Sequence, residues 1–199
     1  MSTQEEMIEL AIKVSDQLQS KGINVVLVGG LAVSCYTDHQ YLTNDIDMID
    51  TTYAKPKTVH EAMADLGFYK KGRYFVSDEI DTSVEFPTAP LRVGDEVVQE
   101  YVTLQIGSGS LSILKAEDII KDRLSAYMHW NDFQSLSQAL SIMQIHKHPP
   151  SEFEGYIIRE KNQNYLNAVV GLFQSCEDQG ISDLEDIISV CEEYRMSLL

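Results

Sequence analysis

Two stretches decide the fold of this chain: INVVLVGG at Ile23–Gly30 and TNDIDMID at Thr43–Asp50. The first is a continuous, β-branched run that ends in two glycines, which is typical of a central strand covered on both faces. An apolar segment over residues 31–36 predicts a short helix directly after it. The second stretch predicts another strand. Asp45 and Asp47 lie two residues apart on that strand, so their side chains share one face.

The two aspartates predict a metal site. Two carboxylates this close repel each other unless a cation lies between them. Mg²⁺ prefers carboxylate oxygens and is commonly bound together with the phosphates of a substrate. Gly29 and Gly30 leave room for a phosphate near the backbone, and the N-terminus of the following helix offers free N–H groups. This combination predicts phosphoryl or nucleotidyl transfer.

The same residues resemble the signature of the nucleotidyltransferase superfamily, which has the polymerase-beta-like fold. The matching segment is Thr43-x-Asp45-x-Asp47, preceded by Gly29-Gly30. The Gly-Gly pair is similar to the branch that holds the AbiEii-type toxins and related uncharacterised bacterial proteins. The resemblance implies a nucleotidyltransferase that moves NMP from an NTP to a hydroxyl or phosphate acceptor. It covers roughly residues 23 to 50, with a weaker likeness from Glu117 to Asp132.

Two positions depart from the family pattern. The pattern reads Arg-x-Thr-x-Asp-x-Asp, and Tyr41 stands at the Arg position. Asn131 stands where the resemblance indicates a Lys. Losing a guanidinium removes a bidentate contact to phosphate or carboxylate. These departures motivate an alternative function, a catalytically weak binding protein with the same fold, such as a toxin–antitoxin component.

Two-metal nucleotidyl transfer needs a third carboxylate on a neighbouring strand. The next apolar strand offers Glu85, although the family more often has Asp at this place, and Asp81 is the competing residue. We predict that Asp45, Asp47 and Glu85 are catalytic and bind two Mg²⁺ ions; Asp81, or no third ligand, remains the alternative. Asp50 faces the other way by strand parity and is predicted to form a turn.

The nucleotide is predicted to bind in a cleft between the sheet and a helical half. The nucleotide-binding candidates on the sheet side are Gly29, Gly30 and Thr43. On the helical side the resemblance indicates Arg123, which falls where related proteins have a Lys. The alternative is that Arg123 pairs with a neighbouring acid on its own helix. We also expect that no basic residue neutralises the three carboxylates before metal binds.

The predicted fold class is α/β (α+β), a mixed sheet with flanking helices followed by a helical half. The predicted domains are 1–110, nucleotidyltransferase-like and catalytic, and 111–199, helical. Beyond the segment 107–110 the apolar residues recur at helical spacing, which predicts helices. Ser151 and Ser182 are predicted to cap the last two helices, and Trp130 is predicted to lie in the core.

The net charge of −16 over 199 residues limits the partners. Non-specific nucleic-acid binding is excluded, because affinity for the phosphate backbone depends on basic side chains. A tRNA acceptor would need a local basic patch. The best candidate lies at Lys70–Arg73, for which a solvated hairpin is the alternative. The acidic surface favours a small cationic molecule or a protein as acceptor.

The chain has three cysteines and no C-x-x-C pair. An odd, widely spaced set of this kind is typical of reduced thiols in a reducing compartment. No N-terminal basic segment precedes an apolar run, and no window approaches the roughly 18 apolar residues of a membrane span. We therefore expect a cytoplasmic protein with no membrane partner.

Overall fold

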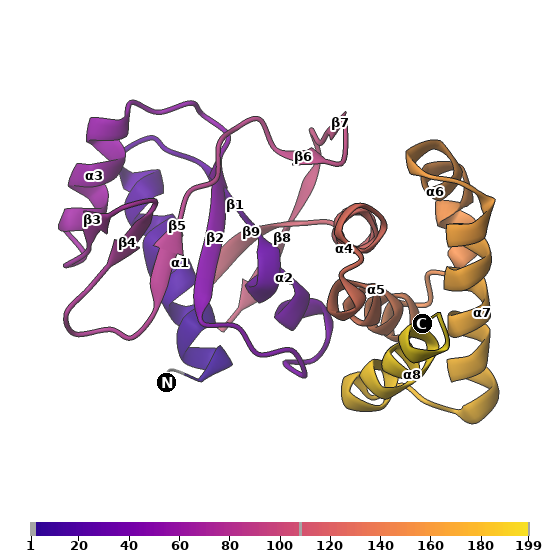
Figure 1. Cartoon of the computed structure of the whole chain (residues 1–199). Coiled ribbons are helices and arrows are strands. Elements are labelled where there is room, and N and C mark those ends of the chain that lie inside the picture. The colour runs from indigo at the N-terminus through magenta and orange to yellow at the C-terminus, as the bar shows by residue number, and fades with distance from the viewer. Residues whose placement is uncertain (1–2, 108, 199) are drawn as a thin grey trace. The chain divides into compact units, whose positions relative to one another are not determined.

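The computed structural model describes residues 3–107 and 109–198. Within this described part of the chain, a mixed seven-stranded sheet has the order β3-β4-β5-β2-β1-β9-β8 (Figure 1). Its strands are β1 (Val25–Val28), β2 (Asp45–Asp50), β3 (Tyr69–Lys71), β4 (Tyr74–Val76), β5 (Ser83–Glu85), β8 (Tyr101–Ile106) and β9 (Gly109–Leu114). A separate two-stranded sheet holds β6 (Arg92–Val93) and β7 (Glu96–Val97).

The helices are α1 (Gln4–Ser20), α2 (Gly29–Tyr36), α3 (Pro56–Ala64), α4 (Ala116–Trp130), α5 (Phe133–His146), α6 (Glu154–Glu160), α7 (Gln163–Gln179) and α8 (Leu184–Ser197), with the 3-10 helix η1 (Pro150–Phe153). The predicted fold class, a mixed sheet with flanking helices followed by helices, is confirmed. None of the helices in the described residues has the length and hydropathy needed to cross a membrane.

The contacts within the chain divide it into two compact units. The first comprises Met1–Ser34, Leu42–Arg92 and Glu96–Lys115 and holds the large sheet. The second comprises Cys35–Tyr41, Val93–Asp95 and Ala116–Leu199 and holds helices α4 to α8. The predicted functional domains, 1–110 and 111–199, stay a prediction.

One face of the large sheet is apolar and covered by helices. Leu27 of β1 pairs with Met48 of β2, Val84 of β5 lies on the same face by register, and all three side chains are fully buried. Helix α1 lies on this face, because a Cβ built at Gly109 of β9 would lie 2.6 Å from Ile12 of α1. Helix α3 packs beside α1 (Figure 1). The opposite face carries Asp45 and Asp47 together with the buried apolar pair of Val26 and Ile49.

Helix α1 begins at a capping box. The Thr3 hydroxyl accepts a hydrogen bond from the Glu6 amide at 3.2 Å, and the Glu6 carboxylate accepts one from the Thr3 amide at 2.7 Å. Met7, Val14 and Leu18 form the buried stripe of the helix. Burying each such side chain contributes roughly 1.5–3 kcal/mol, so this stripe anchors α1 to the sheet.

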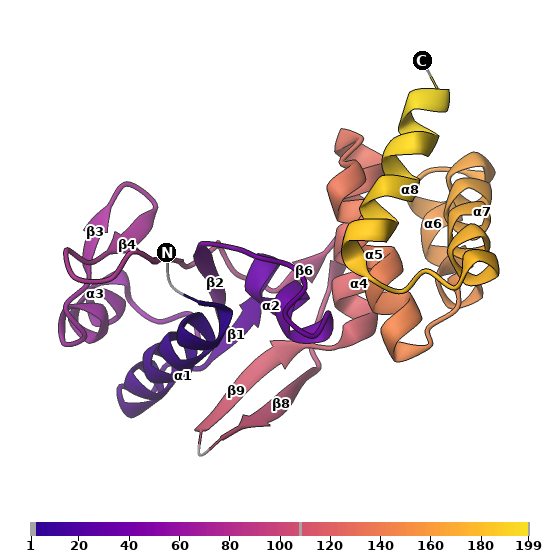
Figure 2. The ribbon, with the colours of Figure 1, turned by 90° about the horizontal axis from the view of Figure 1, so that it is seen from below.

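The prediction of helical structure beyond the segment 107–110 is wrong for residues 111–114. Gly109–Leu114 forms β9, which pairs antiparallel with β8 and parallel with β1 (Figure 2). The physical reason is the spacing of the apolar residues: Leu111 and Ile113 are fully buried and alternate with half-buried serines. Apolar residues two apart share one face only in an extended chain.

The second unit corrects the predicted helix boundaries. The helix expected from Ser151 is divided, because Asn162 caps α7 by accepting a hydrogen bond from the Asn164 amide at 2.9 Å. The last helix is capped one residue later than predicted: the carboxylate of Asp183, not Ser182, accepts from the helix backbone. Both caps are Asn or Asp, which compete with Ser at this position.

The expectation that Trp130 belongs to the core is also wrong. Trp130 is the last residue of α4 and is 77% exposed. The buried stripe of this helix runs through Ile120, Leu124 and Tyr127. At helical spacing this stripe continues at position 131 rather than 130, and Asn131 ends the helix with a positive φ of 53°.

The three cysteines are free thiols. Burial raises the pKa of Cys35 and of Cys191 to about 11. A thiol whose pKa is raised on folding stabilises the protein fully below the unfolded-state pKa of about 9, and this contribution is lost as pH rises towards about 11.

We therefore expect Cys35 and Cys191 to react slowly with a thiol reagent in the folded protein at mildly alkaline pH, because the thiolate is the reactive form. The measurement is the time course of thiol labelling, with the denatured protein as control. Equal rates for the folded and denatured chains would contradict the burial of these thiols.

A candidate active site on one face of the sheet

A row of polar side chains crosses the sheet on the face opposite α1. Asp47 of β2 pairs with Glu85 of β5, Glu85 pairs with Tyr74 of β4, and Tyr74 pairs with Lys71 of β3. Directly paired residues on neighbouring strands point to the same face, and the strands lie about 4.8 Å apart. Asp45 lies two residues before Asp47 and shares this face. The register therefore brings the three predicted carboxylates together.

Thr43 holds the first of these carboxylates. Its hydroxyl donates a hydrogen bond to Asp45 Oδ1 at 2.7 Å. The side chain of Gln4 in α1 donates in turn to the Thr43 carbonyl at 3.0 Å. Asp45 and Thr43 are both half-buried, so this chain of contacts fixes the orientation of Asp45 from the first helix of the protein.

Gly29 stands where β1 ends and α2 begins, and its φ is +66°. A Cβ built at this position would clash with Asp47 Oδ2 and lie 3.0 Å from Asp47 Cγ. The sequence suggested that the glycine makes room for a phosphate; in the structure, the group that needs the room is the Asp47 carboxylate. Gly30 follows as the second residue of α2. Nucleotide binding by this pair stays a prediction.

The substitution Gly29→Ala is expected to destabilise the protein by about 2–4 kcal/mol, since a left-handed conformation and a clash with Asp47 act together. The measurement is the free energy of unfolding in denaturant. Gly22→Ala is the matched control: Gly22 has a φ of +76° with nothing within 4 Å of an added Cβ. Equal destabilisation of the two variants would show that contact with Asp47 contributes nothing.

A basic residue lies against the carboxylates, so the expectation that none would neutralise them is wrong. Arg73 Nε lies 3.3 Å from Glu85 Oε2, with the arginine side chain 70% exposed and the glutamate 17% exposed. Arg73 also donates a hydrogen bond to the Tyr74 hydroxyl, and its guanidinium lies 4.8 Å from the centre of the Tyr74 ring. That hydrogen bond, and then the charges of Glu85 and Asp47, raise the pKa of Arg73.

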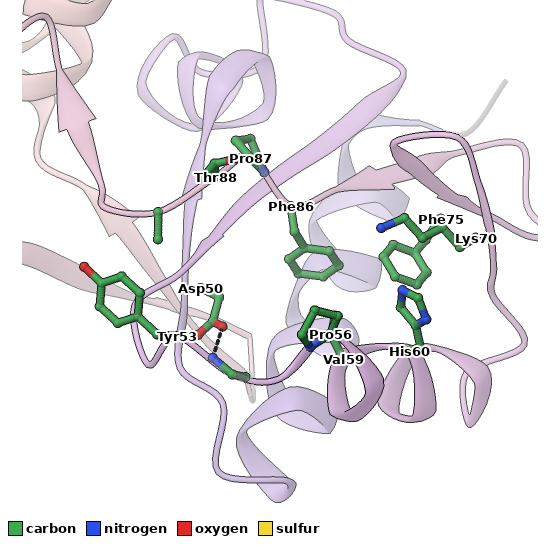
Figure 3. A pocket seen from close by; sticks show the side chains of 12 residues that line it. Asp50, Tyr53, Pro56, Val59, His60, Lys70, Phe75, Phe86, Pro87 and Thr88 are labelled. Carbon is green, nitrogen blue, oxygen red and sulfur yellow. Dashed lines mark hydrogen bonds between the residues drawn. The ribbon is translucent and has the colours of Figure 1, made fainter.

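The basic patch predicted at Lys70–Arg73 is split between the two faces of the sheet. Lys71 and Arg73 belong to the carboxylate face, whereas Lys70 pairs with Phe75 on the other face, its ammonium 5.6 Å from the ring centre. Lys70 lines a pocket of about 370 Å³ with Phe75, Phe86 and His60 (Figure 3). Phe86 directly follows Glu85, so strand alternation places this pocket opposite the carboxylates.

Asp50 forms a turn, as predicted. Its carboxylate oxygens accept hydrogen bonds from the amides of Thr52 at 2.8 Å and Ala54 at 2.6 Å. Asp50 thereby organises the loop between β2 and α3 and lies at the edge of the pocket in Figure 3.

Two other predicted residues lie away from the row. Asp81 lies in the loop before β5, not on the strand, and is exposed. Arg123 lies on α4 in the second unit, where its Nε donates to Asp122 at 2.9 Å. Pairing with a neighbouring acid was the alternative for Arg123, and it is the contact observed. A role for Arg123 in nucleotide binding stays a prediction.

The donors on the carboxylate face suit a hard divalent cation in their chemistry, because all three are carboxylates. Arg73 already brings a positive charge to Glu85, and Gly29 leaves the space that the Asp47 carboxylate needs. Within residues 3–107 and 109–198, no three His, Cys, Asp or Glu side chains are arranged as they stand to hold an ion. In this conformation, Asp45 is bonded to Thr43 and Glu85 is paired with Arg73.

Comparison with known proteins gives one structural likeness. No protein-family model matches the chain, and no curated protein matches it significantly in sequence. A solution structure of the antibiotic-resistance factor ANT(2'')-Ia, an aminoglycoside nucleotidyltransferase, is similar with a TM-score of 0.43 and 12% identity. The likeness covers 98% of this chain and 96% of that one. Similarity at this level assigns neither a family nor an activity to the chain.

Proposed function

We propose that this protein is a Mg²⁺-dependent nucleotidyltransferase, which moves NMP from an NTP to a hydroxyl or phosphate acceptor and releases pyrophosphate. One observation carries the proposal: Asp47 lies directly beside Glu85 in the strand register, with Asp45 on the same face. Carboxylates from two adjacent strands on one face are what a pair of divalent cations in phosphoryl transfer requires.

Each residue of the site has a role in this proposal. Asp45 and Asp47 bind the two Mg²⁺ ions, and the hydrogen bond from Thr43 keeps Asp45 oriented for this. Glu85 binds the catalytic ion and accepts the proton of the acceptor hydroxyl. When bound, the ions activate the acceptor oxygen and neutralise the triphosphate. Gly29 and Gly30 form the N-terminus of α2, whose backbone N–H groups would bind the phosphates beside the Asp47 carboxylate.

The charge distribution favours a small cationic molecule or a protein as the acceptor. The net charge is −16. Of the basic patch that a tRNA end would need, Lys70 lies on the other face of the sheet. An acidic protein surface attracts a cationic acceptor and repels a polyanion.

The alternative is a binding protein with the same fold and little or no catalysis, such as a component of a toxin–antitoxin system. Tyr41 in place of Arg and Asn131 in place of Lys favour it, because each removes a cation that could bind phosphate. This alternative predicts a stable protein partner and no nucleotide binding.

Calorimetry with Mg²⁺ and each of the four NTPs separates the two functions. The enzyme is expected to bind at least one NTP with Kd below about 100 μM, which corresponds to roughly −5.5 kcal/mol. Release of pyrophosphate with candidate acceptors then tests turnover. The absence of nucleotide binding, together with a stable complex with a co-purified protein, would overturn the proposed activity.

A further inference from the structure

We propose that Arg73 is a cation latch on Glu85: its guanidinium occupies this carboxylate in the metal-free protein, releases it when a divalent cation binds, and then contacts the phosphates of the nucleotide. The inference rests on the proposed function for its last step. Its first step, competition between a guanidinium and a metal for one carboxylate, concerns only the residues described above.

The position of Arg73 supports the latch. Arg73 follows Gly72 at the turn between β3 and β4, and β4 is the strand directly beside β5. Its Nε lies 3.3 Å from Glu85 Oε2, longer than a typical charged hydrogen bond. The side chain is 70% exposed. An ion pair whose arginine is this exposed contributes little to stability, so a stronger cation can replace the guanidinium.

The electrostatics of the face give the reason for the pair. Three carboxylates share one face across two strands, and like charges at such a spacing repel each other. Arg73 places one positive charge beside Glu85, and the charge of Asp47 also acts on Arg73. A divalent cation brings twice this charge within direct contact of the oxygens, so metal and guanidinium compete for the same carboxylate.

Release leaves Arg73 positioned beside the site. Its guanidinium lies over the ring of Tyr74, which stands next to Glu85 in the row, and Lys71 stands next in the row on the same face. A triphosphate held at Asp45 and Asp47 adds negative charge to this face. Arginine binds phosphate oxygens with two parallel hydrogen bonds, so the phosphates offer the freed guanidinium a strong partner in place of Glu85.

The experiment titrates Mn²⁺ into the metal-free protein and follows the free ion by electron paramagnetic resonance. Arg73→Ala is expected to bind Mn²⁺ about two- to five-fold more tightly than the wild type, the range set by an exposed ion pair. Lys70→Ala is the matched control, since it removes a positive charge from the same hairpin but from the opposite face. It is expected to bind Mn²⁺ as the wild type does.

A second titration uses a non-hydrolysable NTP analogue with saturating Mg²⁺. Here Arg73→Ala is expected to bind roughly ten-fold more weakly, the typical cost of losing a hydrogen bond to a charged group, and Arg73→Lys to recover part of the affinity. A change in opposite directions for metal and nucleotide is the signature of the latch, because simple damage to the fold would weaken both.

A double-mutant cycle identifies the carboxylate that Arg73 blocks. In a Glu85→Gln background, Arg73→Ala is expected to raise Mn²⁺ affinity by less than it does in the wild-type background, since its ion pair with Glu85 is already absent. Wild-type protein that binds Mn²⁺ with no gain in Arg73→Ala would overturn the latch. Wild-type protein that binds Mn²⁺ but no nucleotide, with the gain still present, would overturn the proposed activity and the phosphate step and leave the competition at Glu85 standing.

Discussion

Replacing Asp47 by Asn is expected to reduce Mg²⁺-dependent turnover of NTP by about 10³-fold or more in kcat/KM, because positioning and charge neutralisation supply most of the rate in phosphoryl transfer. Asp47 is the central carboxylate of the three. It pairs with Glu85 across the strands, and the absence of a Cβ at Gly29 leaves the space that its carboxylate occupies. The measurement is pyrophosphate release at saturating Mg²⁺.

The same variant separates a functional role from a structural one. Removing a charge from a crowded carboxylate face relieves repulsion, so Asp47→Asn is expected to unfold at an equal or higher denaturant concentration than the wild type. Asp65→Asn is the control, since Asp65 is an exposed partner of Lys21 away from the row. Turnover that survives in Asp47→Asn would remove the metal site from this face.

Glu85→Gln is expected to lower kcat by about 10²–10³-fold, because the variant loses both a metal ligand and the group that accepts the acceptor's proton. Asp81→Asn is expected to keep kcat within about three-fold of the wild-type value, because Asp81 lies in the loop before β5 and not on the strand. The measurement is the rate of a single turnover with preformed enzyme–nucleotide complex. The reverse order of effects would assign the third ligand to Asp81.

The local pattern of this sequence predicts two central strands and the shared face of two aspartates. An apolar run ending in Gly29-Gly30 and an alternating strand with two aspartates suffice to predict β1, β2 and a shared face for Asp45 and Asp47. Alternation is a property of each strand by itself. The alternation of side chains therefore holds in the folded protein whenever the segment forms a strand.

What the sequence does not predict is the pairing between strands. In the sequence, Arg73 is only one member of a run of basic residues. Its contact with Glu85 depends on the register that places β4 beside β5. Strand β9 was missed for a related reason: its apolar segment is short, and its place beside β1 is a long-range contact. A hairpin prediction extended to its neighbouring strand would have found Arg73.

Gly29 shows that a sequence can indicate the need for space near the backbone without identifying the neighbouring group. A glycine after a strand suggests that another group lies close to the backbone, and phosphate commonly binds at a helix N-terminus. The structure places a carboxylate of the protein itself there. Sequence pattern indicates that room is needed, but only the folded register identifies the group that fills it.

The contact between Gly29 and Asp47 also has an evolutionary consequence. A side chain at position 29 and a carboxylate at position 47 exclude one another, so the two positions are expected to change together among descendants of this chain. A lineage that has lost the carboxylate at position 47 no longer needs a glycine at position 29 to avoid a clash. The left-handed backbone conformation still disfavours β-branched residues at position 29. Paired loss at these two positions would thus mark lineages that kept the scaffold after the reaction had gone.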